Sequence, residues 1–235
     1  MRDAVAAQRE REHEGYTPEQ LSLRARAQAK LLATQRKNEL RFAADPWVFI
    51  RDAVYTLDQI DGTIKRFPDM EYLAYMSRMW HRTRQLAVPK SRRMKMSWLM
   101  CALHYWLARF HHGVKIAFVS RKEGRNESEG SAELVWRAKF IHDHLPASVR
   151  PVPIVYKFCY LGFPESNAEI VGMGQGADQL RQLTLTAILG DEVAFWEHAE
   201  PAYTSMKPTL EGGGRITLIS SANPGFFKRL VHDEL

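Results

Sequence analysis

A short basic loop between an apolar strand and an apolar helix carries the side chains best suited to bind phosphate. The loop runs from Lys90 to Ser97, after a β-rich run at 85–88 and before a helical segment at 98–110. A loop that joins a strand end to a helix N-terminus directs backbone N–H groups and the positive end of the helix dipole at one point. Its basic side chains would neutralise the β and γ phosphates of a triphosphate, and the hydroxyl of Ser97 could bind Mg²⁺.

This loop departs from the ordinary phosphate-loop pattern G-x-x-x-x-G-K-S/T. Ser97 matches the final position, but Met96 replaces the lysine and Lys95 replaces the second glycine. A nucleotide site would therefore need its lysine from elsewhere, with Lys90 as the first candidate and Lys95 as the second. A basic surface turn between a strand and a helix is the alternative. The candidate phosphate-binding residues are Lys90, Ser91, Arg92, Arg93, Met94, Lys95, Met96 and Ser97.

Two adjacent carboxylates, Asp191 and Glu192, follow a second apolar run at 185–189. A buried strand places its terminal side chains at the carboxyl edge of the sheet, where the nucleotide sites of open α/β folds lie. Asp191 could then hold Mg²⁺ through its water shell, while Glu192 could polarise the attacking water. A helix N-cap with a first-turn acid is the alternative, but it does not explain the apolar strand before the pair.

A third apolar run, at 215–220, leads into the small polar residues Ser220, Ser221 and Asn223. In nucleoside triphosphatases with an extra central strand, such a polar tip lies between the other two segments. There it can sense the γ-phosphate and pass its loss to a moving segment. A strand followed by an Asn-Pro-Gly turn is the simpler alternative.

Short β-rich and helical runs alternate along most of the chain. Strands are expected at 85–88, 114–119, 185–189 and 216–220, a hairpin at 154–161 and 168–171, and helices at 70–81, 98–110 and 128–144. Alternation of this kind predicts an α/β fold of three layers, with a mostly parallel central sheet and helices on both faces.

The first 40 residues contain little that would interrupt a helix. Thr17-Pro18-Glu19-Gln20 supplies an N-cap, a proline at the first helical position and a capping-box glutamine, so a second helix should begin there. The basic side chains of this segment could follow a phosphate backbone; a solvated helical arm or a docking surface for a partner subunit is the alternative. They are Arg24, Arg26, Lys30, Arg36 and Lys37.

Composition narrows the class of protein. The 235 residues are 45% hydrophobic, which is enough apolar material for one sizeable core. Because no apolar run could span a membrane and the N-terminus is charged, a cytoplasmic setting is expected. The net charge of +6 favours a polyanionic partner such as nucleic acid. Cys101 and Cys159 lie in apolar stretches and are expected to be buried and reduced.

Taken in this order, the basic loop at 90–97, the acidic pair at 191–192 and the polar residues that end the run at 215–220 resemble segments of the large terminase family of tailed bacteriophages. The loop from Lys90 to Ser97 is similar to the form of that family's phosphate loop in which the lysine is moved forward. The run from Asp191 to Trp196 is similar to the family's D-E-x-A-F/W motif, and the run from Ser220 to Gly225 to its coupling motif. The run from Gly176 to Gln182 resembles the D-x-x-R-G segment, with Gln182 replacing the glycine. The match extends from Asp45 to the C-terminus.

The resemblance implies a P-loop ATPase domain of the extra-strand, catalytic-glutamate type at 61–235, preceded by an N-terminal helical arm or lid at 1–60. ATP and Mg²⁺ would be the cofactors, with Ser97 and Asp191 as metal ligands and Glu192 as the catalytic residue. Arg92 matches the loop arginine that stabilises the γ-phosphate. Arg121 or Arg125 would act on the nucleotide of a neighbouring subunit, and a solvated basic loop is the alternative for both. The glutamine that the family places against adenine is missing from 67–72.

The same resemblance implies a motor that couples ATP hydrolysis to the translocation of double-stranded DNA into a procapsid. Its partners would be other copies of the chain in a ring, a portal protein and the small terminase subunit, in the cytoplasm of an infected bacterial cell. Family members carry a nuclease domain after the ATPase domain, and this chain ends about ten residues past the coupling motif. No nuclease activity is therefore expected.

Two other functions are compatible with these residues. A helicase-like or remodelling ATPase would use the same chemistry, although it should bring further motifs in a second RecA-like domain. A non-catalytic basic DNA-binding or assembly module would keep the fold with a loop that no longer binds nucleotide. Loss of hydrolysis with ATP binding kept after Glu192→Gln is expected of the motor, whereas no ATP binding by the unmutated chain would favour the non-catalytic module.

Overall fold

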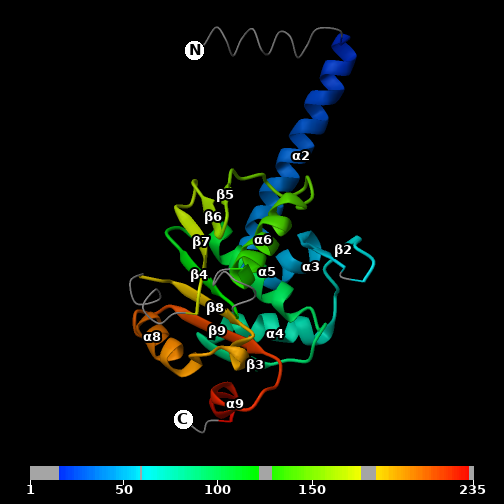
Figure 1. Ribbon diagram of the computed structural model, residues 1–235. Helices are drawn as coiled ribbons and strands as arrows, with labels where there is room; N and C mark the ends of the chain where they lie inside the picture. Colours follow the sequence, from blue (N-terminus) through cyan, green and yellow to red (C-terminus); the bar gives the residue numbers. More distant parts are fainter. Residues whose placement is uncertain (1–15, 59, 122–128, 176–183, 233–235) are drawn as a thin grey trace.

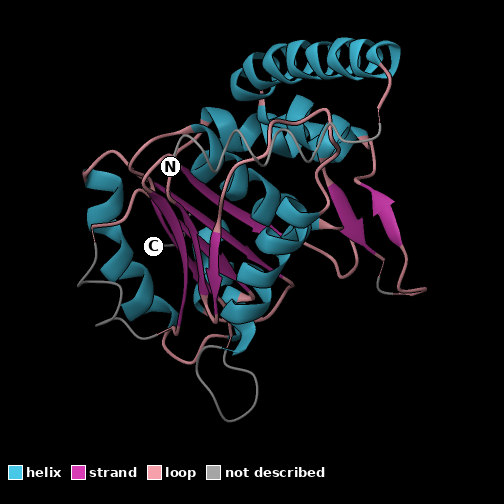
Figure 2. Ribbon diagram, turned by 90° about the horizontal axis from the view of Figure 1, so that it is seen from above, coloured by secondary structure: helices cyan, strands magenta, loops and turns pink. Residues whose placement is uncertain are grey.

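A seven-stranded sheet lies at the centre of the molecule, and helices cover both of its faces (Figures 1 and 2). The computed structural model describes residues 16–58, 60–121, 129–175 and 184–232. Within this part of the chain, the predicted three-layer α/β architecture is confirmed.

The strands follow the order β3-β9-β8-β4-β7-β6-β5 across the sheet. The first five run parallel to one another, and β6 and β5 pair antiparallel at one side. Although β9 comes last along the chain, it lies between β3 and β8, which is the predicted extra central strand. The bounds are Gln85–Pro89 (β3), Lys115–Val119 (β4), Val155–Lys157 (β5), Tyr160–Phe163 (β6), Ala168–Met173 (β7), Ala187–Asp191 (β8) and Arg215–Ser220 (β9).

The helices and a small second sheet surround this core. A two-stranded antiparallel hairpin, β1 (Tyr55–Leu57) and β2 (Ile64–Arg66), stands apart from the main sheet. The helices are α2 (Pro18–Ala44), α3 (Pro46–Ala53), α4 (Glu71–Arg82), α5 (Met96–Phe110), α6 (Glu129–Asp143), α8 (Ala199–Glu211) and α9 (Phe226–Val231), with a short 3₁₀ turn, η1, at Val193–Phe195.

Alternating side chains of the parallel strands fill two separate cores. Ile116 and Phe118 of β4 pack with helices α3 to α6 on one face, whereas Ala117 and Val119 pack with α8 and α9 on the other. Because successive side chains of a strand point to opposite faces, a strand covered on both sides must be apolar throughout. This requirement explains the uninterrupted apolar runs in the sequence.

The predicted hairpin between the runs at 154–161 and 168–171 is present, because β6 pairs antiparallel with β7, but the extent of its first strand is wrong. The first of these runs is not one strand, because it turns at Phe158 and Cys159 into two short strands, β5 and β6. Cys159 has a backbone φ of 56° in this turn and is only half-buried, which corrects the expectation that it is buried. Cys101 is buried as expected, and neither cysteine forms a disulfide bond in the described part of the chain. Helices α8 and α9 and the β1–β2 hairpin were not predicted.

Helix α2 has a docked half and a free half. Thr17 and Gln20 form the predicted capping box at its start. Near its C-terminal end, Gln35 and Asn38 donate hydrogen bonds to the carbonyl oxygens of Ala147 and Ser148, at 2.8 and 3.1 Å. The N-terminal half extends away from the body (Figure 1). The proposed division of the chain at residue 60 stays a prediction.

None of the described helices is long and apolar enough to cross a membrane.

Candidate functional site

The three candidate segments meet at the carboxyl edge of the parallel sheet. The ends of β3 and β9 lie in register at Pro89 and Ser220, and β8 ends beside them at Asp191. The backbone N–H of Lys90 donates a hydrogen bond of 2.8 Å to the carbonyl oxygen of Ser220. The phosphate-loop candidate, the acidic pair and the polar strand tip therefore share one location, although more than 100 residues separate the first two.

The loop after β3 adopts left-handed backbone conformations without glycine. Arg93 has a φ of 65° and Lys95 a φ of 54°. Lys95 stands where the ordinary pattern has its second glycine, so this loop keeps the conformation for which glycine is usually selected. Each non-glycine residue in this region costs about 1–2 kcal/mol. Tyr72 supports the loop by donating a hydrogen bond of 3.1 Å to the carbonyl oxygen of Met94.

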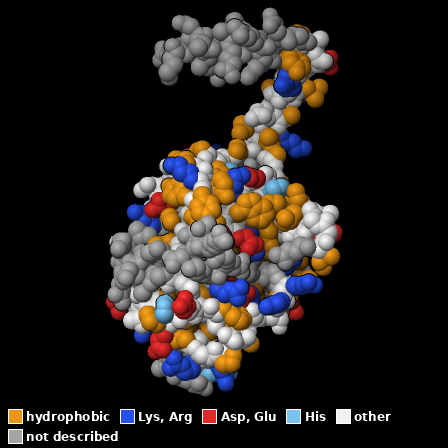
Figure 3. Space-filling model, viewed as in Figure 1, with side chains coloured by type: hydrophobic (Ala, Val, Ile, Leu, Met, Phe, Trp, Pro, Cys, Tyr) orange, Lys and Arg blue, Asp and Glu red, His pale blue; other side chains and the backbone are white. Residues whose placement is uncertain are grey.

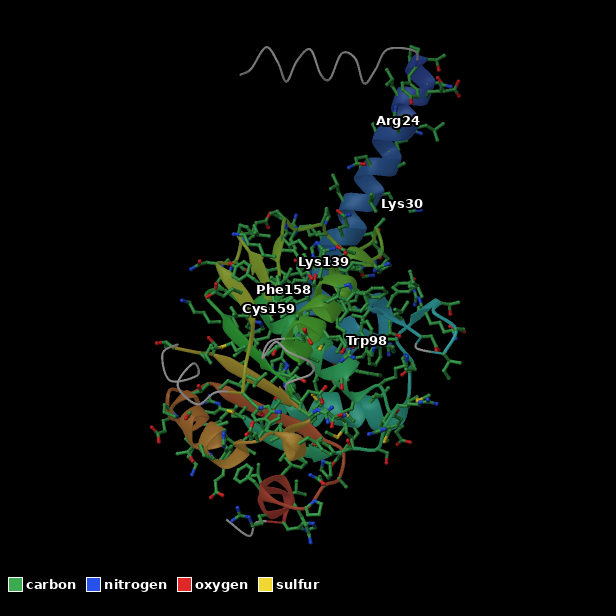
Figure 4. The ribbon with its side chains drawn as sticks, viewed as in Figure 1. Arg24, Lys30, Trp98, Lys139, Phe158 and Cys159 are labelled. Atoms are coloured by element: carbon green, nitrogen blue, oxygen red, sulfur yellow. The ribbon has the colours of Figure 1, made fainter. Side chains whose placement is uncertain are left out.

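A cavity of about 210 Å³ lies between the loop, the start of α5 and the β1–β2 hairpin. Figure 4 labels Trp98, which lies at the start of α5. Because α5 begins at this cavity, its first backbone N–H groups and the positive end of its dipole favour an anion there. The lining residues are Asp58, Ile60, Lys90, Ser91, Arg93, Met94, Lys95, Met96, Ser97, Trp98 and Arg137.

Lys90 connects this cavity with the acidic pair. Its Nζ atom lies 2.9 Å from Oε1 of Glu192 and 3.5 Å from Oδ1 of Asp191. The side chains of Lys90 and Asp191 are 8% and 7% exposed, so this ion pair is shielded from solvent. A shielded cation between two carboxylates is more strongly bound than a surface ion pair. The forward position of the lysine is therefore structurally possible, since Lys90 reaches both the cavity and the acids.

Glu192 is held in place from several sides. Its backbone is left-handed, with a φ of 54°, and its N–H donates a hydrogen bond of 2.9 Å to Oδ1 of Asp191. The hydroxyl of Ser221 donates to Oε2 of Glu192 at 2.9 Å. Burial by itself would raise the pKa of Glu192, but the hydrogen bonds and charge of Lys90, together with Ser221, outweigh it and lower the pKa. Glu192 is consequently an ionised, oriented carboxylate beside the cavity.

The polar residues at the end of β9 form hydrogen bonds with the turn that follows the acidic pair. The hydroxyl of Ser220 accepts a hydrogen bond of 3.1 Å from the N–H of Ala194, and the side-chain amide of Asn223 donates one of 2.9 Å to the Ala194 carbonyl. With the bond from Ser221 to Glu192, all three predicted coupling residues contact the segment from Glu192 to Ala194. A shift of this segment would therefore be transmitted to β9.

Trp196 packs against the end of β8 that carries Asp191. Its indole N–H donates a hydrogen bond of 2.9 Å to the carbonyl oxygen of Asp191. The ring lies against Gly190, where an added Cβ would come within 2.9 Å of the indole and 2.8 Å of the Leu218 side chain. Gly190 is thus required for the close packing of Trp196 on β8. The simple N-cap alternative for Asp191 does not hold, because Asp191 is the last residue of a buried strand and no α-helix starts there.

The predicted arginines occupy different surroundings. Arg92 is exposed and does not line the cavity, whereas its neighbour Arg93 does. The guanidinium of Arg121 lies 5.8 Å from the centre of the Phe195 ring, just after the acidic pair. Arg125 lies outside the described residues, as does the run at 176–182 that resembles the D-x-x-R-G segment. The roles of these arginines stay predictions.

The cavity also contains residues that were not identified from the sequence. Arg137 of α6 reaches it, and its guanidinium lies 5.7 Å from the centre of the Trp98 ring. Asp58 and Ile60 line it from the β1–β2 hairpin. No local motif marks these positions. Arg137 belongs to a helix whose polar sequence is typical of a solvent-exposed helix, and the β1–β2 hairpin shows no strong alternation of polar and apolar residues. Trp136 and Phe140, four residues apart on α6, are the only aromatic residues of this helix, and both rings contact the ring of Trp98 on α5.

The residues present suit Mg²⁺ as a metal partner. Mg²⁺ prefers oxygen ligands and is usually held by one or two carboxylates together with substrate phosphates. Ser97 offers a hydroxyl in the cavity, and Asp191 offers a buried carboxylate that Lys90 links to the cavity. Across the described ranges, no group of three or more His, Cys, Asp and Glu side chains could hold a metal.

Several solved structures with a similar fold are ATPase domains or whole chains of phage large terminases. The large terminase of bacteriophage HK97 matches 82% of this chain, with a TM-score of 0.61 and 14% sequence identity. The large terminase of a thermophilic bacteriophage, solved in complex with ADP, matches 70% of this chain, with a TM-score of 0.52 and 13% identity. The ATPase domain of the Thermus phage P74-26 large terminase, in an arginine variant, matches 68% of each chain, with a TM-score of 0.50 and 12% identity.

The shared part is the ATPase fold. This chain spans 40% of the HK97 chain and 43% of the ADP-bound chain. At such low sequence identities, the likeness shows that the chain has the fold of these ATPase domains. No protein-family model matches the sequence, and no curated protein sequence matches it.

Proposed function

We propose that this chain is the ATP-hydrolysing motor domain of a viral DNA-packaging terminase. It would couple hydrolysis of Mg-ATP to the translocation of double-stranded DNA into a procapsid. The observation that carries this proposal is the position of Lys90, which lines the phosphate cavity and pairs with Glu192 at 2.9 Å. One cluster then contains a phosphate-binding cation, a carboxylate that can act as a base and an anion-binding helix start.

The phosphates of ATP would be bound by this chain's own loop. Backbone N–H groups at the start of α5, with Lys90, Lys95 and Arg93, would neutralise the β and γ phosphates. Ser97 and Asp191 would hold Mg²⁺, which supplies charge neutralisation of the phosphate oxygens. Glu192, whose pKa is lowered in its pairing with Lys90, would accept a proton from the attacking water.

The hydrogen bonds between the end of β9 and the turn after the acidic pair would couple hydrolysis to movement. Ser221 contacts Glu192, and Ser220 and Asn223 contact Ala194. Loss of the γ-phosphate changes the charge next to Glu192, and these hydrogen bonds would pass a change in the turn to β9 and on to α9.

The likeness to solved structures supports this assignment. The neighbours are described as large terminases or their ATPase domains, and one is described as a complex with ADP. The net charge of +6 agrees with a DNA partner. Assembly as a ring on a portal protein, contact with a small terminase subunit and a place in the infected cell are further parts of this proposal.

The test is ATP hydrolysis by the full 235-residue chain with and without Glu192. Glu192→Gln keeps the size of the side chain but removes its basicity, so hydrolysis should fall by about 100-fold or more while ATP still binds. Glu197→Gln is the matched control, because Glu197 is exposed and lies five residues further along the chain. Hydrolysis that survives Glu192→Gln at the level of the control would contradict the proposal.

The alternatives predict different results. A non-catalytic DNA-binding or assembly module predicts no ATP binding by the unmutated chain. A helicase-like ATPase predicts the same response to Glu192→Gln, but with stimulation by single-stranded rather than double-stranded DNA. Measuring hydrolysis with each kind of DNA separates the two ATPase functions.

A further inference from the structure

Within the described part of the chain, the N-terminal half of α2 packs no face against the rest of the molecule. Every residue from 22 to 30 is exposed, and the space-filling view shows this half standing clear of the body (Figure 3). The docked half, in contrast, buries Gln35 and Phe42. Most helices in proteins are stabilised by packing one face, so a half-helix with no buried side is suited to contact something outside the chain.

The exposed surface of α2 is strongly basic. Between Glu19 and Glu39 the helix carries no acidic residue. Among residues 16–58, 60–121, 129–175 and 184–232, no ion-pair partner is found for five of its six cations, which are Arg24, Arg26, Lys30, Arg36 and Lys37. Figure 4 places Arg24 and Lys30 on the part of α2 that extends away from the body. The next cation, Arg41, differs because it is paired with Asp52.

The cations are arranged for a long anionic partner. Arg26, Lys30 and Lys37 are spaced by four and seven residues, which places them within about 40° on one face and along about 16 Å of the helix axis. Arg24 and Arg36 lie on other sides of the same helix. A helix in the major groove of DNA has phosphates on both sides of it, and the groove, about 12 Å wide, admits one helix.

The apolar side chains do not favour a protein groove as the partner. Amphipathic helices that bind such a groove present apolar anchors at spacings of three, four and seven residues. The exposed leucines of α2 are Leu23, Leu32 and Leu40, with 64%, 54% and 73% of their surfaces accessible. Leu23 and Leu32 lie about 180° apart on the helix, so they form no stripe. A second copy of this chain is also disfavoured, since its net charge is +6.

We propose that α2 is a docking surface for double-stranded DNA, held through the phosphates of both strands by these five cations, which have no ion-pair partner within the described part of the chain. The choice of duplex DNA rests on the proposed function, whereas the preference for a polyanion rests on the helix alone. This contact would hold the DNA without reading its sequence, because phosphate contacts carry no base information. It would hold the DNA at α2, a helix that does not line the cavity at the start of α5.

The test is the salt dependence of binding to a fluorescent 30-base-pair duplex of mixed sequence. The test variant of the full chain combines Arg26→Gln, Lys30→Gln and Lys37→Gln, because glutamine keeps a high helix propensity. Each lost phosphate contact lowers the slope of log K against log salt by about 0.9, so this variant should lose about 2 to 3 units of slope and bind at least about tenfold more weakly.

The matched control combines Arg78→Gln, Arg82→Gln and Lys228→Gln, which remove three exposed cations from the body. The proposal expects a clearly smaller loss of slope in this control. Equal losses in the two variants would overturn it, because only net charge would then matter. An unchanged slope in the α2 variant would also overturn the proposal, and it would favour a protein as the partner of α2.

A second readout separates this proposal from the proposed function. Binding of a non-hydrolysable ATP analogue should be the same in the unmutated chain and the α2 variant, since α2 does not line the cavity. If neither binds the analogue but the DNA slope still falls, the ATPase proposal fails and the DNA surface stands.

Discussion

The ammonium group of Lys90 lies 2.9 Å from Oε1 of Glu192 and 3.5 Å from Oδ1 of Asp191. The same side chain lines the cavity at the start of α5. Lys90 thus links the cavity that would hold the phosphates with Glu192, the carboxylate that would activate water. A polyphosphate in the cavity would compete with Glu192 for this single cation, so binding and the orientation of the base are linked.

Replacing Lys90 should weaken nucleotide binding directly. A hydrogen bond to a charged group is worth about 1.5–3 kcal/mol, so Lys90→Gln should weaken binding of an ATP analogue by about 10- to 150-fold in calorimetry. Lys115→Gln is the control, because Lys115 begins β4 and lies at the amino edge of the sheet. Thermal unfolding of both variants checks the fold. An unchanged affinity in Lys90→Gln would remove Lys90 from the site.

Ser221 should act as a positioning residue for Glu192. Its hydrogen bond to Oε2 contributes to the lowered pKa of Glu192, so Ser221→Ala should raise that pKa. Because the base acts in its ionised form, the acidic limb of the kcat profile should move to higher pH, and kcat should fall by about tenfold. Ser221→Thr, which keeps the hydroxyl, should restore the profile. A fall in kcat without movement of the acidic limb would contradict this role.

Gly190 should be intolerant of any side chain. A Cβ there would lie 2.8 Å from Leu218 and 2.9 Å from Trp196, and both neighbours are themselves buried. Gly190→Ala should therefore lower the free energy of unfolding by about 1–3 kcal/mol, the usual effect of overpacking. In Gly212→Ala the nearest atom would be 3.4 Å away, so the change should be small. Urea unfolding of the two variants measures the difference, and equal stabilities would disprove the close packing.

Buried His104 should make the fold sensitive to mild acid. Burial lowers its pKa from 6.5 to about 3. Between these two values the unfolded chain binds a proton that the folded chain does not, so stability falls as the pH falls below 6.5. The loss should be about 2 kcal/mol between pH 6.5 and pH 5. His104→Phe should flatten this part of the stability profile in urea titrations, whereas His112→Gln, at an exposed site, should not. An unchanged slope in His104→Phe would contradict the assignment.

The sequence was sufficient to predict the parts of the site that lie at strand ends. Asp191, Ser220 and Lys90 each follow an apolar run, and parallel strands bring their carboxyl ends to one edge. Their proximity followed from that rule alone. The capping box at Thr17 was equally local, because each partner lies within one helical turn.

The remaining parts depend on contacts that no local pattern encodes. Arg137 reaches the cavity only because α6 packs beside α5, and the β1–β2 hairpin lines it from a separate small sheet. The turn at Cys159 has a φ of 56° without a glycine or asparagine to mark it. The same holds for Lys95, which has a left-handed conformation directly before the first residue of α5. Surrounding structure, rather than residue preference, determines these positions.

The most direct test of the central claim is a crystal structure of the full chain with a non-hydrolysable ATP analogue and Mg²⁺. The account predicts a phosphate oxygen within about 3 Å of Nζ of Lys90, with Ser97 and Asp191 facing the metal and Glu192 facing the γ-phosphate. A nucleotide bound away from the loop at 90–97, or phosphates that leave Lys90 paired only with Glu192, would contradict it.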